Sequence, residues 1–332
     1  MKKRGMSVHV DELLPASAFK RKNGNILDRL FAGSVLLGRL FLRIIVISRP
    51  SDILIVHREA FPFFTPVFER IAAKRSGMAI LDIDDAVYAD PTHRRDWRRI
   101  LRNPVRALEY KDMFDVILCG NDVLLGDFDN GKATVVYAPT CPPVATFDTI
   151  RRPSDPRILM WTGSQSTLGS LQKVLPQVLD ACESHDLVLH VLGGANISEL
   201  PKHPRIRAQL WSAEAEMELL GRASLGLMPL PDTEWERGKS GYKAILYLCA
   251  GLPSVISPVG INRRLAEEYE SISACNDNDW TATIARALES SNAYNGLVST
   301  NEDSSQALAR GVFHSSDNAS RTVDSVLSQA TL

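Results

Sequence analysis

The sequence predicts an α/β protein with two parallel sheets, and three observations support that fold class. Short apolar runs typical of buried strands alternate with amphipathic stretches typical of helices. Pro142–Pro156, rich in proline and polar residues, interrupts the alternation and is expected to be a linker. The length of 332 residues and the hydrophobic content of 45% suit two domains with large cores. We therefore expect one Rossmann-like domain over residues 1–150 and a second over residues 151–332.

Charge and cysteine content exclude several classes of protein. The 38 lysines and arginines balance 39 acidic residues, so the chain has no bulk attraction to nucleic acid. The five cysteines are far apart and form no C-x-x-C pair, which predicts reduced thiols and argues against a zinc site. The basic N-terminus is not followed by the apolar core of a signal peptide. We expect a cytoplasmic protein.

The expected strands fall into two groups. Those of the first domain are Asp52–Val56, Met78–Ile83, Asp115–Cys119 and Thr134–Ala138, with Ser7–Val10 as a further short candidate. Those of the second are Arg157–Trp161, Leu187–Leu192, Ile206–Trp211, Leu225–Pro229, Ser254–Ser257 and Ser271–Ala274. Strands that alternate with helices form parallel sheets, and such sheets bind ligands beyond the carboxyl ends of their strands. The loops after the strands are therefore the expected sites, in a cleft between two facing domains.

Ile26–Ser48 is the most hydrophobic stretch, and three arginines interrupt it. Arg29, Arg39 and Arg43 disfavour a membrane-spanning helix. The favoured interpretation is a helix that packs its apolar side on the first domain. The alternative is a helix whose basic sector rests on an anionic membrane, which would make the protein peripheral at that surface.

Glu234–Asn262 is the stretch around which the chain is organised. Glycines at 238 and 241 precede an apolar segment of helical length, which stops at Gly251. Lys239 and Lys243 lie four residues apart, at the expected start of that helix. A helix N-terminus with free amides and nearby cations suits a diphosphate, whereas the plainer interpretation is a solvated helix start.

Polar residues follow two strands of the first domain. Asp82, Asp84 and Asp85 close one strand, and His57 follows another. The carboxylates could bind an acceptor hydroxyl, act as a base, hold a metal or cap the next segment, and we favour Asp84 and Asp85 for a functional role. No partner at suggestive spacing supports a metal. His57 either contacts a ligand or caps the strand end.

The small-residue loop Thr162–Thr167 lies between a strand and a helix of the second domain. That is the usual place of a phosphate loop, although the loop contains no G-x-G-x-x-G and no P-loop motif. Ser164 or Ser166 as a simple helix cap is the alternative.

Four segments together resemble the group 1, or family 4, glycosyltransferases, which have the GT-B fold. They are Ala79–Ala86 (AILDIDDA), Ile158–Ser164 (ILMWTGS), Leu225–Leu230 (LGLMPL) and Gly238–Gly260, whose close GLPSVISPVG is the most specific part. The resemblance covers the chain from about Ser51 onward. It implies two Rossmann-like domains, a nucleotide-diphosphate-sugar donor, no required metal or other cofactor, and transfer with retention of anomeric configuration.

The resemblance also assigns roles to residues. Lys239–Gly241 match the glycine loop whose amides hold the donor diphosphate, with Lys239 and Lys243 as counter-charge. Gly163 and Ser164 match the first loop of the donor domain. Pro258 and Gly260 close the same donor-binding motif. Asp84, Asp85 and His57 become the candidates for catalysis on the acceptor side.

The chain departs from the family pattern in three places. The family often has two glutamates eight residues apart, and the later one usually holds the donor ribose. These positions map to Gly238 and Leu246, with Glu234 or Glu236 as a substitute for the first. No basic residue stands beside the Gly163 loop. The segment Arg4–Val8 matches a part of the family that follows a first strand and helix, so that first βα unit is expected to be missing. Either the reading frame was started late or the first domain has lost the unit.

We therefore expect a glycosyltransferase that moves a sugar to a hydroxyl of a glycan or a lipid-linked glycan. Two alternatives remain open. One is a truncated, non-catalytic homologue that binds a nucleotide sugar, and the other is a sugar epimerase of similar architecture.

Overall fold

The structure is a computed structural model, and its description covers residues 7–12, 15–21, 25–47, 49–61, 66–89, 104–143, 147, 157–276 and 278–295, with a few positions between 309 and 324. Most of the expected linker Pro142–Pro156 lies outside these residues. Contacts divide the described chain into two units. The first takes the residues up to Cys119, Leu124–Tyr137 and those after Arg321, and the second takes Gly120–Val123 and Ala138–Arg321.

The first unit contains a parallel sheet in the order β1-β2-β3-β4 among its described residues. Its strands are β1 (Ser51–His57), β2 (Ser76–Ile83), β3 (Val116–Cys119) and β4 (Thr134–Tyr137). Its main helices are α1 (Ala16–Arg21), α2 (Ile26–Ile47), α3 (Val67–Lys74) and α5 (Asp122–Phe128), with 3-10 turns η2 (Val87–Ala89) and η3 (Pro104–Asp112). The register pairs His57 with Asp82, so polar residues of neighbouring strands meet at the carboxyl edge of the sheet.

Apolar strand residues build the core of the first unit. Leu81, Ile83 and Ile117 are fully buried, and they pack with Phe61 and Phe128 from the flanking segments. The predicted strand Ser7–Val10 is wrong, because these residues have no regular secondary structure. The described strands therefore begin with β1, at an edge of the sheet.

The second unit contains a larger parallel sheet, in the order β10-β9-β8-β5-β6-β7 among its described residues. Its strands are β5 (Ile158–Thr162), β6 (Val188–Gly193), β7 (Ile206–Leu210), β8 (Leu225–Met228), β9 (Ser254–Ile256) and β10 (Ile272–Ala274). Its helices are α6 (Leu168–Ser184), α7 (Ala213–Arg222), α8 (Glu234–Arg237), α9 (Tyr242–Cys249), α10 (Ile261–Glu268) and α11 (Trp280–Asn295), with the turn η5 (Ala195–Glu199). Strand β5 pairs with β6 on one side and β8 on the other, so the order reverses at β5. A parallel α/β sheet binds ligands at such a switch point.

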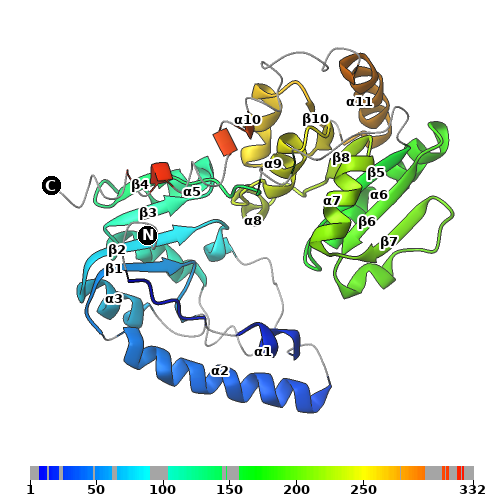
Figure 1. Ribbon diagram of the computed structural model, residues 1–332. Coiled ribbons are helices and arrows are strands. Elements are labelled where there is room, and N and C mark those ends of the chain that lie inside the picture. Colours follow the sequence, from blue (N-terminus) through cyan, green and yellow to red (C-terminus); the bar gives the residue numbers. More distant parts are fainter. Residues whose placement is uncertain are drawn as a thin grey trace. The chain divides into compact units, whose positions relative to one another are not determined.

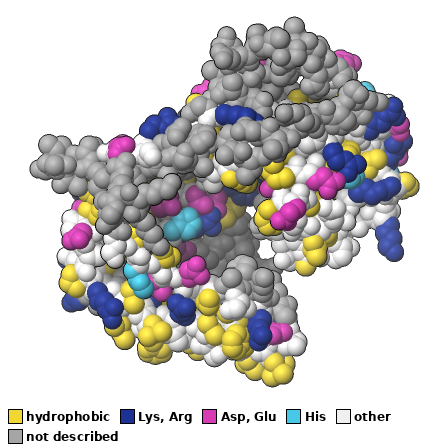
Figure 2. Space-filling view, in the orientation of Figure 1, with side chains coloured by type: hydrophobic (Ala, Val, Ile, Leu, Met, Phe, Trp, Pro, Cys, Tyr) yellow, Lys and Arg dark blue, Asp and Glu magenta, His cyan; other side chains and the backbone are white. Residues whose placement is uncertain are grey.

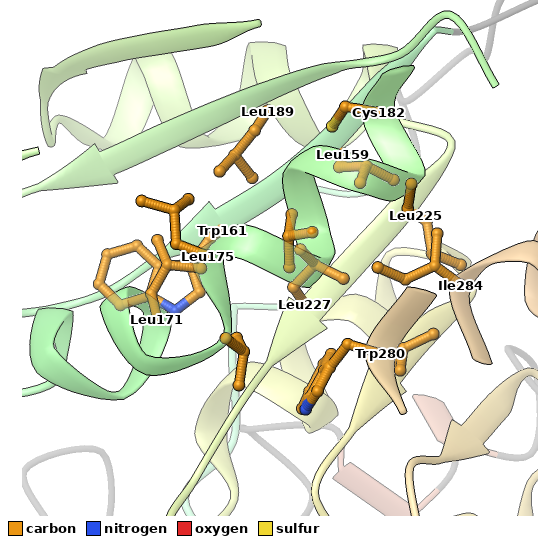
Figure 3. Packing of buried hydrophobic residues seen from close by; sticks show 14 of the residues in the cluster. Leu159, Trp161, Leu171, Leu175, Cys182, Leu189, Leu225, Leu227, Trp280 and Ile284 are labelled. Atoms are coloured by element: carbon orange, nitrogen blue, oxygen red, sulfur yellow. The ribbon is translucent and has the colours of Figure 1, made fainter. Parts of the chain in front are cut away.

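The core of the second unit lies between β5, β8 and the helices α6 and α11 (Figure 3). Leu159, Leu225 and Leu227 point from the strands toward Leu175 and Ile284 of these helices (Figure 3). Both units thus have the predicted fold class, and Figure 1 shows helices packed along each sheet. Among the described helices, none combines the length and the apolar character needed to cross a bilayer.

Candidate functional site

The loop between α8 and α9, residues 238–241, is the centre of the candidate donor site. We refer to it as the donor loop. The sequence predicted a loop leading into one helix, and the structure instead divides the segment into α8, a short loop over residues 238–241, and α9. Thr233 caps α8, since its side chain accepts a hydrogen bond from the amide of Glu236. Gly241 then begins α9, whose first-turn amides have no partner within a helix. These amides can bind an anion.

Two glycines in this region have backbone conformations that other residues rarely adopt. Gly241 has φ of 68°, and a Cβ there would lie 2.7 Å from Cγ2 of Ile261. Gly260 has φ of 58°, and a Cβ there would lie 2.3 Å from the carbonyl oxygen of Arg237. Gly260 therefore lets the loop after β9 pack directly against the end of α8. Its position is structural support for the donor loop.

Lys239 of the loop and Lys243 of the first turn of α9 lie in one largely buried cluster. The Nζ of Lys239 is 2.6 Å from Oε2 of Glu236, and both side chains are largely buried. The Nζ of Lys243 lies 5.3 Å from the ring centroid of Trp161, which is near the carboxyl end of β5. Burial, aided by the positive charge of Lys239, lowers the pKa of Lys243 to about 8. Glu236 pairs with Lys239, and its charge also acts on Lys243, so this group of one carboxylate and two ammonium groups is positive when both lysines are protonated.

Asn121 anchors the backbone of the donor loop. Its buried side-chain amide donates to the carbonyl oxygens of Gly238 at 2.8 Å and Lys239 at 3.1 Å. Asp122 beside it accepts two hydrogen bonds from Arg264 of α10. These contacts fix the carbonyls of the loop on one side, which leaves the amide side to a ligand. Sequence reasoning missed Asn121, because a partner 117 residues away leaves no local pattern.

The loop after β5 approaches the same lysine cluster through Trp161. A Cβ at Gly163 would lie 2.5 Å from the Trp161 ring, so the glycine permits this loop to cross the indole. Ser164 is exposed, and its hydroxyl is 2.9 Å from that of Ser166. Gly163, Trp161 and Lys243 therefore form one continuous set of contacts. Pro258 lies in the loop after β9, where its carbonyl accepts a hydrogen bond from Arg263.

A carboxylate network borders this edge of the sheet. Glu216 of α7 accepts hydrogen bonds from the Thr162 hydroxyl at 2.7 Å and from the Trp211 indole at 3.0 Å. The sequence predicted only an acidic amphipathic helix here. Nothing in that pattern shows that one of its glutamates reaches the ends of β5 and β7.

The positions that carry glutamates in the resembling family have other roles here. Leu246 is buried in the core side of α9, and Gly238 ends α8. Glu236, two residues earlier, is the carboxylate that pairs with Lys239. Glu236 thus neutralises a lysine. The later family glutamate, which binds the ribose, has no counterpart in this chain, because the buried Leu246 occupies its position.

The first unit gathers its polar residues at the carboxyl edge of β1 and β2. Nδ1 of His57 lies 3.0 Å from Oδ2 of Asp82, and this hydrogen bond raises the pKa of His57. Arg58 donates from Nε and Nη2 to both oxygens of Asp84, at 2.5 and 2.7 Å. Its Nη2 also donates to Asp85 at 2.5 Å. The three expected catalytic residues are thus close together, with Arg58 between them.

Arg58 changes the chemistry available to the two aspartates. Burial alone would raise the pKa of Asp84, but the hydrogen bonds and charge of Arg58 outweigh it, and the pKa lies below its ordinary value. A carboxylate with a lowered pKa is a weak proton acceptor and a good fixed anion. Arg58 itself has φ of 58°, a strained conformation for a residue with a side chain. Sequence reasoning named only its neighbour His57.

No protein-family model matches the sequence, and no curated protein matches it either. Solved structures do resemble the fold. The pneumococcal O-GlcNAc transferase GtfA, in complex with UDP and GlcNAc, superposes with a TM-score of 0.55 at 14% identity, over 86% of this chain and 60% of that one. The lipopolysaccharide outer core galactosyltransferase WaaB gives 0.54 at 13% identity, over 88% and 81%.

A UDP-forming α,α-trehalose-phosphate synthase from Burkholderia vietnamiensis gives a TM-score of 0.58 at 10% identity, over 94% of this chain and 83% of that one. The chain thus spans less than two thirds of GtfA and most of the other two. Two parallel α/β units, with a switch point and a glycine-started helix in the second, agree with these likenesses. The chain has the GT-B fold of glycosyltransferases.

Proposed function

We propose that this protein is a glycosyltransferase of the group 1, or family 4, type, which transfers a sugar from a nucleotide-diphosphate sugar to a hydroxyl group. Glycosyltransferases with UDP or a UDP product are among its structural likenesses, which supports this class of donor. The acceptor is a glycan or a lipid-linked glycan, and peripheral contact with a membrane would bring the protein to the latter.

The observation that carries the proposal is the positive cluster at the start of α9. As the bond between the sugar and the diphosphate breaks, negative charge develops on the leaving phosphate. Lys239, Lys243 and the first-turn amides of α9 are positioned to stabilise that charge. Their combined charge supplies what a divalent metal would otherwise supply, so the proposed transfer is metal-independent.

The acceptor side is proposed to use the first unit. His57, with its raised pKa, and the fixed carboxylates of Asp84 and Asp85 can orient a sugar hydroxyl by hydrogen bonds. Transfer is proposed to proceed with retention, through attack on the face from which the diphosphate departs. The reaction then requires no protein nucleophile.

Titration with UDP, GDP and their sugar conjugates tests the donor site directly. We expect one nucleotide diphosphate to bind and to raise the unfolding temperature of the protein. Turnover is then measured as nucleotide release from the preferred donor, with and without glycan and lipid-linked acceptors. Absence of binding by every nucleotide diphosphate would overturn the proposal.

A second candidate is a non-catalytic protein that binds a nucleotide sugar. Leu246 favours it, because this buried side chain stands where the family often has a ribose-binding glutamate. The same titrations separate the two functions. Nucleotide binding without sugar release under any acceptor condition would support the second candidate.

A further inference from the structure

Helix α2 exposes a large apolar surface. Eight of its described apolar side chains are between 44% and 75% exposed: Ile26, Leu27, Leu30, Phe31, Leu37, Phe41, Leu42 and Ile45. We refer to these eight residues as the α2 apolar face. Figure 1 shows α2 along the outside of the first unit, and Figure 2 shows hydrophobic side chains gathered over that region. Single exposed leucines are ordinary, but a continuous set of this kind marks an interaction surface.

The α2 apolar face is one continuous sector of the helix. At 100° per residue its members fall within about 160° of the circumference. Ser34 and Gly38 are the other exposed residues within that sector, so it contains no charge. With about 200 Å² for a large apolar side chain, the exposed fractions amount to on the order of 1,000 Å², above the about 300–600 Å² of the largest patch on a typical monomer.

The opposite side of α2 packs on the first unit. Leu40 is buried in its core, and Leu36 and Ile44 pack against the same cluster. Arg43 also turns this way, since it pairs with Asp11 at 2.5 Å and donates to the carbonyl of Ala60. Arg39 lies 3.6 Å from the same aspartate. The alternative interpretation, a basic membrane-facing sector, is therefore wrong for Arg39 and Arg43, because both side chains anchor the helix to the protein.

Charge distinguishes the part of the chain around α2 from the rest. The first 50 residues contain ten lysines and arginines against three acidic residues, a net charge of +7, whereas the whole chain has −1. Arg21 precedes α2 and Arg49 follows it, and both are exposed. An uncharged apolar sector within a positive segment is suited to a bilayer with anionic headgroups. Two copies of the segment facing each other would instead bring like charges together.

We propose that the α2 apolar face docks on an anionic lipid bilayer. The helix of 22 residues, about 33 Å long, lies in the plane of the interface with Phe41 and its neighbours among the acyl chains. Arg21 and Arg49 near its ends contact the headgroups. This inference deepens the proposed function, on whose peripheral membrane contact it rests, by naming the surface that makes that contact; docking itself requires neither the donor nor the acceptor.

Flotation with lipid vesicles tests it without any sugar donor. The full chain is expected to float with vesicles that contain phosphatidylglycerol and to keep part of that binding at high salt, because the apolar contact is not screened. Leu37→Ser/Phe41→Ser removes two strongly exposed members of the face and should weaken binding at least about tenfold. Arg21→Glu/Arg49→Glu should weaken it at low salt and have little effect at high salt.

Val67→Ser/Val105→Ser is the matched control, since both valines are exposed elsewhere on the first unit. It should bind vesicles as the unaltered chain does, and circular dichroism should show that all variants are folded. Failure of the unaltered chain to float, or equal flotation of Leu37→Ser/Phe41→Ser, would overturn the proposal. So would a lipid-free dimer that this variant dissociates, because the face would then bind a second copy.

Discussion

The two units place polar residues at the same edge of similar parallel sheets, but they balance charge in opposite ways. In the first unit one guanidinium, that of Arg58, is shared by Asp84 and Asp85. In the second, one carboxylate, that of Glu236, stands beside two ammonium groups. Each of these two clusters is thus incompletely neutralised, the first with an excess of negative charge and the second with an excess of positive charge. Similar folds therefore provide sites for different chemistry, and the charge balance indicates which edge suits a diphosphate.

The same contrast holds for the backbone. Gly241 and Arg58 both have a positive φ, at 68° and 58°. The second unit uses a glycine, for which this conformation has little cost. The first unit uses an arginine, which its hydrogen bonds to two aspartates hold in place. The site of the second unit thus depends on Gly241 having no side chain, whereas that of the first unit depends on the contacts of the Arg58 side chain.

The largest effect is expected from Gly260→Ala in the second unit. The added Cβ would lie 2.3 Å from a backbone oxygen of Arg237 at a positive φ, so the loop after β9 must move. We expect about 3 kcal/mol of destabilisation and loss of nucleotide binding. Gly169→Ala in α6 is the control, because no described atom lies within 4 Å of its Cβ position. Urea unfolding and UDP titration measure both effects, and equal stability of the two variants would contradict the assignment.

Arg58→Ala should destabilise the first unit by about 1–3 kcal/mol. The loss is smaller than the about 3–5 kcal/mol of a fully buried pair because the Arg58 side chain is 40% exposed. The physical cause is the two carboxylates left without their counter-charge. Arg106→Ala, which removes an exposed pair with Glu109, should destabilise the unit much less, because water screens that pair. If both variants unfold at the same urea concentration, Arg58 is not the centre of the cluster.

Lys239→Ala and Lys243→Ala should each weaken nucleotide diphosphate binding by about 1–3 kcal/mol, the range for a charge-assisted hydrogen bond. Lys202→Ala is a suitable control, since this exposed lysine lies on the loop before β7. Calorimetric titration of UDP and GDP provides the measurement. Unchanged affinity in both variants would remove the lysine cluster from the donor site.

The affinity for a nucleotide diphosphate should fall as the pH rises above about 8. Burial lowers the pKa of Lys243 to about 8, so the free protein has a charged Lys243 below that pH and a neutral one above it. A bound diphosphate favours the ammonium form, so binding above this pH takes up a proton. Titrations in buffers of different ionisation enthalpy detect that proton. Lys243→Met should abolish the uptake, and uptake that persists in this variant would assign it to another group.

The smallest effect on donor binding is expected from Asp84→Asn in the first unit. Nucleotide affinity should change by less than about 0.5 kcal/mol, whereas transfer to an acceptor should slow because a fixed anion is lost. Asp85→Asn should behave in the same way. Measurement of KM for donor and acceptor separates the two effects. A loss of secondary structure in circular dichroism would instead show that the carboxylates are structural.

Local patterns predicted the fold well. The predicted strands Met78–Ile83 and Arg157–Trp161 correspond to β2 and β5 within two residues at each end, because consecutive buried residues are the signature of parallel strands. The glycines and lysines around the start of α9 could also be found from the sequence, since they lie within one short segment.

The parts that could not be predicted depend on partners distant in sequence. The helix position of Arg43 left two interpretations open, a solvent-exposed arginine and a membrane contact, but its side chain instead turns inward to Asp11 and Ala60. Arg58 reaches Asp84 and Asp85 only because β1 and β2 pair in register, which brings the ends of the two strands together. Periodicity indicates which residues share a helix face, and it does not indicate which face an ion pair turns toward the protein.

Asn121 shows that the second unit is assembled from two separated stretches of chain. The residues Gly120–Val123 belong to it by their contacts, although the rest of the unit begins at Ala138. A polypeptide cut at the linker near residue 150 would therefore contain the donor loop without the amide that holds its carbonyl groups. Genetic recombination or proteolysis at that linker would separate an anchor from the loop it supports. The stretch of chain that could be exchanged at the linker therefore differs from the set of residues that fold together as the second unit.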